Sequence, residues 1–195
     1  MSERVAIVTG AGGELGRATA EKLTAAGFTV AGIDRIAAEV GPPAVLVNTI
    51  GTYHLGDALS VTPDDLRLMM DVNLGAALWL TQAVVPYMRD RGAGSIVHVA
   101  SRPGLEPAAG QASYALSKAA LVHLIRILDL ELRPSGIRVN GVAPQLLNTA
   151  VTRSFAPPDV LTHAVTPQAM ADLLSYLAGD ASAPVSGAVV PAYGS

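Results

Sequence analysis

The segment Arg4–Gly27, RVAIVTGAGGELGRATAEKLTAAG, joins an apolar run, a glycine-rich turn and a helix-forming run. Its first six residues are mostly apolar and partly β-branched, which predicts a buried strand. The run after Gly16 predicts a helix that is closed by Gly27. Glycines let a backbone approach a phosphate closely, and a helix N-terminus offers free N–H groups and a favourable dipole. The segment is therefore typical of a dinucleotide-binding strand, turn and helix.

The composition of the chain suits one domain built on a buried sheet. The chain has 195 residues, of which 50% are hydrophobic and only 15% are charged. A parallel sheet between two layers of helices has strands buried on both faces, and it needs such an apolar composition. We therefore expect a single α/β domain over residues 1–195.

The charge pattern and the lack of cysteine argue against several classes of function. The net charge is −3 and no basic stripe is present, so binding to nucleic acid is not expected. Without cysteines the chain has neither disulfides nor thiolate chemistry. The N-terminal sequence, MSERVAIVTG, has no signal-peptide pattern, and charged residues interrupt each apolar run. We therefore expect a cytoplasmic protein without a membrane span.

A second strand is expected over Phe28–Ile33, with Asp34 at its carboxyl end. A carboxylate in that position accepts hydrogen bonds from the ribose hydroxyls of adenosine and repels a 2′-phosphate. Asp34 therefore favours NAD over NADP, although the adjacent Arg35 weakens this preference. The alternative interpretation is that Asp34 is a plain turn residue.

The connection to the next strand is short. Only Arg35–Pro43 separates the second strand from one expected over Ala44–Asn48, so a single helical turn fits there but no additional strand with its own helices. Further along, Thr62–Asp65 has the N-cap threonine, N1 proline and N3 acid of a helix start. The long apolar helix expected over Asp64–Met88 contains Asn73.

A serine, a tyrosine and a lysine follow the strand expected over Gly94–Ala100. Ser101 stands at the carboxyl end of that strand, where ligands bind in open α/β sheets. Tyr114 and Lys118 are four residues apart on an expected helix, so their side chains share a face. A neighbouring ammonium stabilises phenolate and lowers the pKa of a tyrosine toward neutrality, which makes Tyr114 a candidate proton donor or acceptor. Such a pair also occurs by chance, so the prediction depends on the other features expected near it, which are the glycine-rich turn, Ser101 and Asn73.

The last part of the chain predicts a strand, a short connecting segment, a helix and a closing strand. The strand spans Gly136–Val142 and leads to Pro144. After the short segment Leu146–Val165, Thr166–Pro167 supplies the N-cap and N1 residues of the last helix. The closing strand is expected within Val185–Tyr193.

Five motifs in this order resemble the short-chain dehydrogenase/reductase family. They are TGAGGELG at Thr9–Gly16, VNLGA at Val72–Ala76, IVHVAS at Ile96–Ser101, YALSK at Tyr114–Lys118 and RVNGVAP at Arg138–Pro144. The resemblance covers essentially the whole chain. It implies a Rossmann-type, doubly wound parallel sheet with helices on both faces, and an enzyme that uses a nicotinamide cofactor.

The resemblance also implies roles for individual residues. Asn73 would hold a water molecule of a proton relay, and Ser101 would hydrogen-bond the substrate oxygen. Tyr114 would be the general acid/base, while Lys118 would lower the pKa of Tyr114 and bind the nicotinamide ribose. The residues implied to bind the cofactor, which we expect to be NAD rather than NADP, are Gly10, Gly13, Glu14, Leu15, Gly16, Asp34, Arg35, Asn48, Gly51, Tyr114, Lys118 and Pro144.

The chain departs from the family pattern at several positions. Glu14 stands where the family has glycine, and its charge would oppose a phosphate unless the side chain points away. The family's third strand and the helices beside it have no counterpart between the second strand and Ala44. Asn48–Gly51 keeps only the first asparagine and the glycine of an Asn-Asn-Ala-Gly run, and Gln145 replaces a glycine. The PAYG sequence at Pro191–Gly194 resembles the dihydropteridine reductase branch.

Three functions are compatible with these residues. The first is an oxidoreductase that transfers hydride between NAD(H) and a carbonyl or secondary alcohol of a small molecule. The second is a non-redox acid/base enzyme, such as a dehydratase or cyclase, that uses Tyr114 and Lys118; Glu14 and the shortened adenine side favour it. The third is a non-catalytic partner subunit, which would not need an intact Ser/Tyr/Lys set.

Two expected helices, Asp64–Met88 and Ser113–Leu132, are apolar around much of their circumference. A helix that is apolar on nearly all sides must be buried, and one face of a sheet cannot cover it completely. We therefore expect a homodimer or homotetramer that associates through these helices, and the resemblance implies a four-helix interface.

Overall fold

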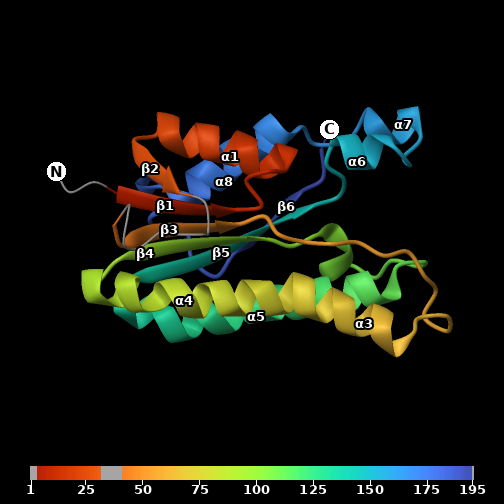
Figure 1. Cartoon of the computed structure of the whole chain (residues 1–195), viewed down its shortest axis with the longest axis horizontal. Helices are drawn as coiled ribbons and strands as arrows, with labels where there is room; N and C mark the ends of the chain where they lie inside the picture. The colour runs from red at the N-terminus through yellow and green to blue at the C-terminus, as the bar shows by residue number, and fades with distance from the viewer. Residues whose placement is uncertain (1–3, 32–40, 195) are drawn as a thin grey trace.

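Six strands form the sheet in the computed structural model, which describes residues 4–31 and 41–194. The strand order is β2-β1-β3-β4-β5-β6 (Figure 1). The strands span Arg4–Thr9 (β1), Phe28–Ala31 (β2), Pro43–Asn48 (β3), Gly94–Val99 (β4), Ile137–Pro144 (β5) and Val189–Ala192 (β6). Each neighbouring pair is parallel, so the carboxyl ends of all six strands lie at the same edge of the sheet.

Helices cover both faces of this sheet (Figure 1). One face carries α1 and α8, and the other carries α4 and α5. Their bounds are Glu14–Ala25 (α1), Ala76–Arg91 (α4), Ala112–Leu132 (α5) and Pro167–Ala178 (α8). Successive strand residues serve different cores: Val8 belongs to the cluster with α1 and α8, and Ile7 to the cluster with α4 and α5. The predicted doubly wound parallel sheet is confirmed.

A continuous helical rod precedes β4 and positions one of the predicted catalytic residues. It runs through α3 (Pro63–Met70), a π-helical turn (Asp71–Gly75) and α4. At its start, the Asp65 N–H donates to Thr62 Oγ1 at 3.2 Å, and the Thr62 N–H donates to the Asp65 carboxylate at 3.0 Å. This reciprocal capping confirms the predicted helix start.

The rod Pro63–Arg91 is long and apolar enough to cross a membrane by length and composition alone. We expected no apolar run of that length, but the charged residues of the rod are concentrated toward its two ends. One such helix is weak evidence for a membrane span, because core helices of soluble proteins pass the same test. Here α4 packs on the sheet, and its Val84, Val85 and Met88 are buried in the core.

The segment between β5 and α8 contains two short helices, α6 (Ala150–Arg153) and α7 (Pro158–Leu161). An isolated parallel bridge between Leu147 and Val165 ties the two ends of this segment together. In Figure 1 both helices lie beyond the carboxyl ends of the strands, on the side of α1 and α8. The predicted short segment therefore sits beside the predicted site.

Within the described part of the chain, β2 is an edge strand that pairs only with β1. Residues 32–40 lie outside the described residues, and they include Asp34 and Arg35. The predicted absence of the family's third strand therefore stays a prediction, as do the cofactor contacts of these two residues. The same holds for a single domain over residues 1–195.

A buried polar chain connects the carboxyl ends of three strands to α4. Thr9 Oγ1 donates to Asn48 Oδ1 at 2.6 Å, which turns Asn48 Nδ2 toward His98 Nδ1 at 3.4 Å. His98 Nε2 lies 3.2 Å from Thr81 Oγ1. Since Asn48 Nδ2 can only donate, His98 Nδ1 is the acceptor and the proton of the neutral ring is on Nε2. His98 is fully buried, and both of its ring nitrogens have hydrogen-bond partners.

Because His98 is buried in this row of hydrogen-bonded side chains, mild acid should lower the stability of the protein. Burial, reinforced by the charge of Lys118, lowers the pKa of His98 to about 4. In the unfolded protein His98 has a pKa near 6.5, so it becomes protonated below that pH while the folded protein keeps it neutral. The stability of the folded state therefore falls as the pH drops from 6.5 toward 4. We expect the free energy of unfolding to fall by about 2 kcal/mol between pH 7 and pH 5. Urea titrations at the two pH values measure it.

The matched control for this prediction is His98→Asn, which keeps a polar side chain but has no group that titrates in this range. The variant should be less stable at pH 7 but should lose most of the pH dependence. An equal pH dependence in both proteins would contradict the assignment of the acid sensitivity to His98.

Candidate active site

The glycine-rich turn between β1 and α1 is shaped by close packing of backbone against backbone. Gly10 has a φ of 68°, in the left-handed region that favours glycine. A Cβ on Gly16 would lie only 2.2 Å from the Gly10 carbonyl oxygen, so a larger residue would not fit there. The helix α1 starts after Gly13 without a side-chain cap, which makes the N–H groups of its first turn available to an anion. The turn therefore fits a dinucleotide phosphate.

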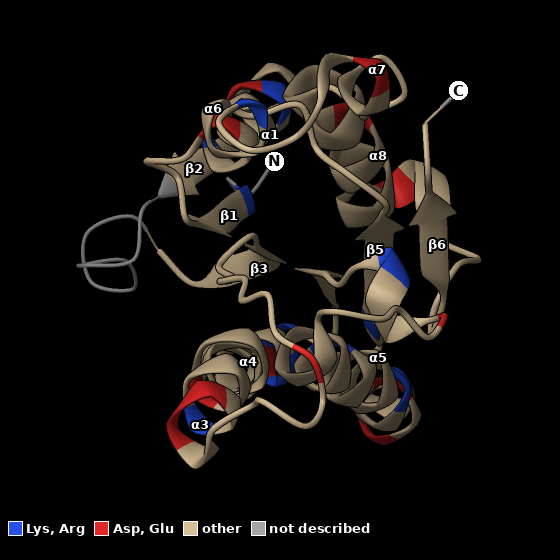
Figure 2. Cartoon of the chain, turned by 90° about the vertical axis from the view of Figure 1, so that its right-hand side faces the viewer, with Lys and Arg blue, Asp and Glu red and all other residues tan. Residues whose placement is uncertain are grey.

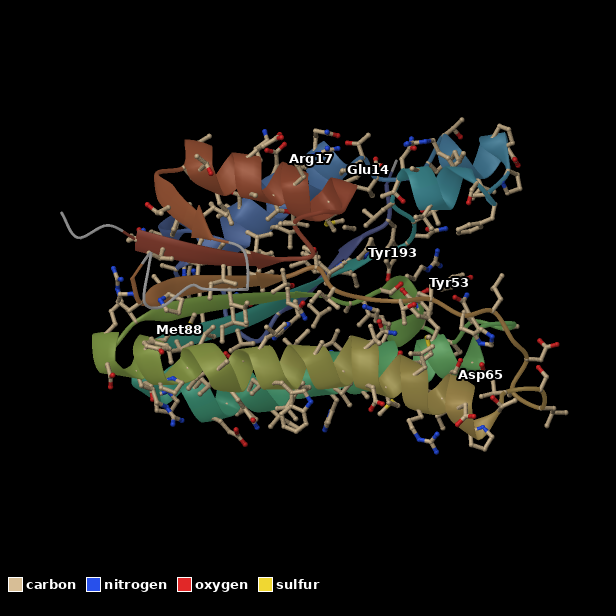
Figure 3. All side chains as sticks on the ribbon, in the orientation of Figure 1. Glu14, Arg17, Tyr53, Asp65, Met88 and Tyr193 are labelled. Atoms are coloured by element: carbon tan, nitrogen blue, oxygen red, sulfur yellow. The ribbon has the colours of Figure 1, made fainter. Side chains whose placement is uncertain are left out.

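Glu14, the residue that departs from the family pattern, points from α1 to α6 (Figure 3). Its Oε1 accepts a hydrogen bond from the Ala150 N–H at 2.6 Å, and Arg153 Nη2 lies 3.5 Å from the same oxygen. The carboxylate thus has a backbone donor and a guanidinium as partners in the connecting segment. We call this contact of Glu14 with Ala150 and Arg153 the Glu14 bridge.

The loop after β3 connects the glycine turn to the predicted catalytic residues. Thr49 Oγ1 donates to the Thr9 carbonyl at 2.5 Å, which holds the loop against the end of β1. Two residues later, a Cβ on Gly51 would lie 3.1 Å from Asn73 Oδ1 and 3.2 Å from Lys118 Nζ. Gly51 therefore allows the backbone to approach both side chains closely.

Asn73 lies in the π-helical turn and is fully buried. Its Oδ1 accepts from the Thr52 N–H at 2.9 Å, and its Nδ2 donates to the Thr52 carbonyl and to Ser117 Oγ, both at 3.0 Å. π-Helical turns inside α-helices often redirect a side chain at a functional site. Here the turn lets Asn73 bind the loop after β3 to α5.

Ser101 and Tyr114 meet at the carboxyl end of β4. Ser101 is 5% exposed, and its hydroxyl donates to the Pro144 carbonyl at 3.4 Å. Ser101 also lies close enough to Tyr114 to influence the pKa of that phenol. The turn after Ser101 packs tightly on α5, because a Cβ on Gly104 would lie 2.7 Å from the Lys118 carbonyl carbon. The strand end and the helix are thus held in direct contact at the site.

The buried ammonium of Lys118 is directed at a backbone carbonyl. Lys118 Nζ donates to the Val99 carbonyl at 2.8 Å and lies 5.9 Å from the centre of the Tyr114 ring. The side chain is nearly inaccessible, and burial lowers the pKa of Lys118 to about 8. The lysine and tyrosine share a helix face, as predicted.

The predicted lowering of the pKa of Tyr114 is wrong for this structure. Burial raises the pKa of Tyr114, the neighbouring Ser101 hydroxyl opposes the rise, and the neighbouring Tyr53 adds to it. The physical reason is that removal from water disfavours phenolate, while Lys118 is turned toward Val99. Tyr114 therefore holds its proton at neutral pH.

Two aromatic residues for which the sequence predicted no role extend outward from Tyr114: Tyr53 contacts Tyr114, and Phe155 contacts Tyr53. The Tyr53 and Tyr114 rings meet edge to face, with centroids 4.8 Å apart and planes at 83°. The Phe155 ring, from the turn after α6, stacks on Tyr53 at 6.1 Å and 13°. The sequence signal for Tyr53 was its position two residues after Gly51; nothing in the sequence pointed to Phe155.

The remaining predicted cofactor residues within the described part of the chain lie at the same edge, but two have their side chains inside the protein. Asn48 is 2% exposed and bonds to Thr9 and His98, so its side chain holds strands together. Leu15 packs in the core on the α1 side, which leaves only its backbone to face a cofactor. Pro144 ends β5 beside Ser101.

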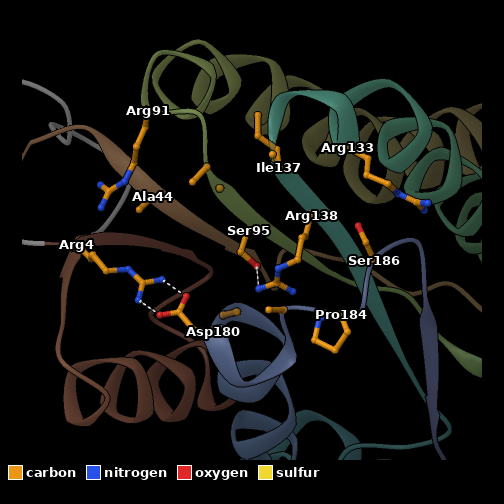
Figure 4. Close-up of a pocket in the computed structure, with 15 residues that line it drawn as sticks. Arg4, Ala44, Arg91, Ser95, Arg133, Ile137, Arg138, Asp180, Pro184 and Ser186 are labelled. Carbon is orange, nitrogen blue, oxygen red and sulfur yellow. Dashed lines mark hydrogen bonds and ion pairs between the residues drawn. The ribbon is translucent and has the colours of Figure 1, made fainter.

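A cavity of about 700 Å³ lies at the opposite edge of the sheet, where the strands begin (Figure 4). Two of the arginines that line it, Arg4 and Arg138, have structural partners. Arg4 pairs with Asp180 at 2.7 Å, and Arg138 donates to the Leu177, Ser182, Val185 and Gly179 carbonyls and to the Ser95 hydroxyl. This cavity is far from the predicted catalytic residues in the fold, and we assign the site to the carboxyl edge.

Comparison with known proteins identifies the family. The model of the short chain dehydrogenase family matches residues 33–159, which is more than half of the chain. The chain therefore belongs to the short-chain dehydrogenase/reductase family of oxidoreductases. The expectation drawn from the five motifs is confirmed.

Individual relatives give a more detailed picture. The chain is 36% identical over 124 residues to 4-formylbenzenesulfonate dehydrogenase TsaC1/TsaC2 of Comamonas testosteroni, covering 63% of this chain and 49% of that protein. It is 34% identical over 162 residues to 3-alpha-(or 20-beta)-hydroxysteroid dehydrogenase of Mycobacterium tuberculosis, covering 81% of this chain and 62% of that protein. The chain thus spans about half to three fifths of the length of these two relatives.

A solved structure supports the fold. The crystal structure of gox2181 superposes with a TM-score of 0.90 at 27% identity, covering 99% of this chain and 95% of that chain. None of these relatives supports the resemblance to the dihydropteridine reductase branch.

The Glu14 bridge predicts a measurable change in the connecting segment. Glu14→Ala removes the acceptor of the Ala150 N–H and the partner of Arg153, so hydrogen exchange of the Ala150 amide should accelerate about tenfold. Global stability should change by less than about 1 kcal/mol because the pair is partly exposed. Glu21→Ala, on an exposed position of the same helix, is the control. Equal exchange rates in the two variants would contradict the bridge in solution.

Proposed function

We propose that the protein is an oxidoreductase that transfers hydride between NAD(H) and a carbonyl or secondary alcohol of a small molecule, with Tyr114 as general acid/base. One observation carries this proposal: three segments bring Asn73, Ser101, Tyr114 and Lys118 together at the carboxyl edge of the sheet. The relatives support it, since one is named for a formyl compound and the other for a hydroxysteroid, and both are named dehydrogenases.

Each of the four residues has a role that its environment supports. Ser101, which lies beside Tyr114 at the end of β4, would orient the substrate oxygen beside the phenol. Tyr114 holds its proton at neutral pH, so it is ready to donate that proton to a carbonyl oxygen during reduction. Lys118 places a positive charge near the phenol and favours phenolate once the proton has left. Asn73 keeps the loop after β3 in place.

The glycine turn and the loop after β3 are the parts of the chain that would hold a dinucleotide. The first turn of α1 offers N–H groups to the phosphates, and Gly51 leaves its backbone close to Lys118. When bound, the nicotinamide supplies or accepts the hydride, which no side chain of the protein can do. We propose NAD rather than NADP because Asp34, outside the described residues, follows the second strand in the sequence.

The Glu14 bridge weakens one argument for a non-redox enzyme. That alternative was favoured partly because a carboxylate in the glycine turn would repel phosphates. Glu14 has Ala150 and Arg153 as partners, and Arg153 compensates its charge. The redox function is therefore the better supported of the two.

Calorimetry and turnover test this proposal together. We expect the protein to bind NADH at micromolar concentration and NADPH more weakly. Tyr114→Phe should bind NADH with the same affinity as the unsubstituted protein. Its kcat for carbonyl reduction should be about 100-fold to 10,000-fold lower, because the variant lacks the acid/base group. Tyr87→Phe, a half-exposed tyrosine on α4, is the control and should retain activity. No binding of either dinucleotide at millimolar concentration would refute the oxidoreductase proposal.

We also propose that the protein self-associates through α4 and α5, which form the lower layer in Figure 2. Large apolar side chains are exposed on these two helices. They are Trp79, Tyr87, Leu116, Ile127 and Leu130, with exposed fractions of 39–72%. Soluble monomers rarely expose large contiguous apolar patches, so a second copy of the chain is the partner that we expect there.

A charge placed on these helices should separate the subunits. We expect the double substitution Ile127→Glu/Leu130→Glu to reduce the mass in light scattering to that of the monomer, because two buried carboxylates oppose association. Leu59→Glu, in the exposed loop before α3, adds a charge away from α4 and α5 and should leave the mass unchanged. If light scattering gives the monomer mass for the unsubstituted protein, the proposed interface is contradicted.

A further inference from the structure

Three aromatic rings form a continuous row that starts at the proposed catalytic hydroxyl. We call Tyr114, Tyr53 and Phe155 the aromatic row. Tyr53 touches Tyr114 edge to face at 4.8 Å, and Phe155 stacks on Tyr53 at 6.1 Å. The rings come from α5, from the loop after β3 and from the turn after α6, so three separate segments converge to build it. Three of the eight aromatic residues of the chain are in this row.

The outer part of the row is open to solvent. Tyr53 is 43% exposed and Phe155 is 54% exposed, whereas Tyr114 is largely buried. An aromatic residue whose role is only to fill the core would be covered, since burial is what stabilises it. The rings instead lead from Tyr114 outward to solvent, where they are accessible to a bound molecule.

Charged groups beside the row are directed at other protein groups. His54, next to Tyr53, lies 3.6 Å from Asp65. Arg153, two residues before Phe155, donates to the Asn148 carbonyl at 3.2 Å and lies near Glu14. The row therefore presents ring carbon rather than charge to a bound molecule.

An exposed row of rings at a catalytic group favours a flat partner. Aromatic pairs are stabilised beyond the burial of their area when they stack with an offset or meet edge to face. A flexible alkyl chain has no such geometric preference and loses more rotational freedom when it is bound. A ring attached to the reacting carbon would contact Tyr53 first and Phe155 next.

We propose that the substrates are aryl carbonyl compounds, in which an aromatic ring is attached directly to the reacting carbonyl carbon, and that Tyr53 and Phe155 determine this preference. The proposal rests on the oxidoreductase function proposed above. Tyr53 and Phe155 act by binding the ring and take no part in proton transfer.

Three eight-carbon methyl ketones test the preference: acetophenone, cyclohexyl methyl ketone and octan-2-one. With NADH present, we expect kcat/KM for acetophenone to exceed that for octan-2-one about tenfold or more. The value for cyclohexyl methyl ketone, whose ring is not planar, should lie between the two. Phe155→Leu should lower kcat/KM for acetophenone about fivefold to tenfold and change that for octan-2-one less than twofold. Equal losses on all three ketones would overturn the proposal.

Controls separate the ring contact from a general defect. Phe155→Leu is the main variant because Phe155 lies on an exposed turn, and Tyr53→Leu is the second. Tyr176→Leu, a half-exposed tyrosine on α8, should change none of the three values. NADH binding should be the same in all variants, since the ring contacts of Tyr53 and Phe155 are with each other and with Tyr114.

A binding measurement keeps the two proposals distinguishable. Saturation-transfer NMR with acetophenone as the probe should show contacts of the ring protons, and Phe155→Leu should weaken them several-fold. If no ketone is reduced but acetophenone binds in this way, the oxidoreductase proposal fails and the aromatic site stands. If ketones are reduced without preference for acetophenone, the oxidoreductase proposal stands and the aromatic site fails.

Discussion

The buried ammonium of Lys118 is the constraint on which the arrangement of the site depends. A charge removed from water is costly unless it is paired or hydrogen-bonded, and Lys118 is 4% exposed. Its acceptor, the Val99 carbonyl, lies at the end of β4, and the loop after β3 passes so close to the ammonium that a Cβ on Gly51 would lie 3.2 Å from it. In this fold the end of β4, the loop after β3 and α5 therefore meet around Lys118.

Much of this arrangement follows from local patterns in the sequence. The four-residue spacing of Tyr114 and Lys118 indicates a shared helix face, and the position of Ser101 after an apolar strand places it at the carboxyl edge. Helix starts such as Thr62 could be predicted because a cap involves neighbouring residues. These features depend on contacts within a few residues.

Other features depend on contacts that no local pattern specifies. The direction of the pKa shift of Tyr114 is set by burial, which is a property of the packed structure. The Glu14 bridge joins residues at opposite ends of the chain, and Phe155 reaches Tyr53 only because the segment after β5 folds back over the sheet edge. A sequence could indicate that Glu14 is unusual, but not which partner would compensate its charge.

The Glu14 bridge and the aromatic row share one structural element. Helix α6 receives Glu14 at its first residue, Ala150, and the turn that ends it carries Phe155 to Tyr53. The helix has only four residues, so both contacts are made by neighbouring parts of one short segment. The glycine turn, which we propose to hold a dinucleotide, and the aromatic row, which we propose to contact the substrate, are therefore joined through this one helix.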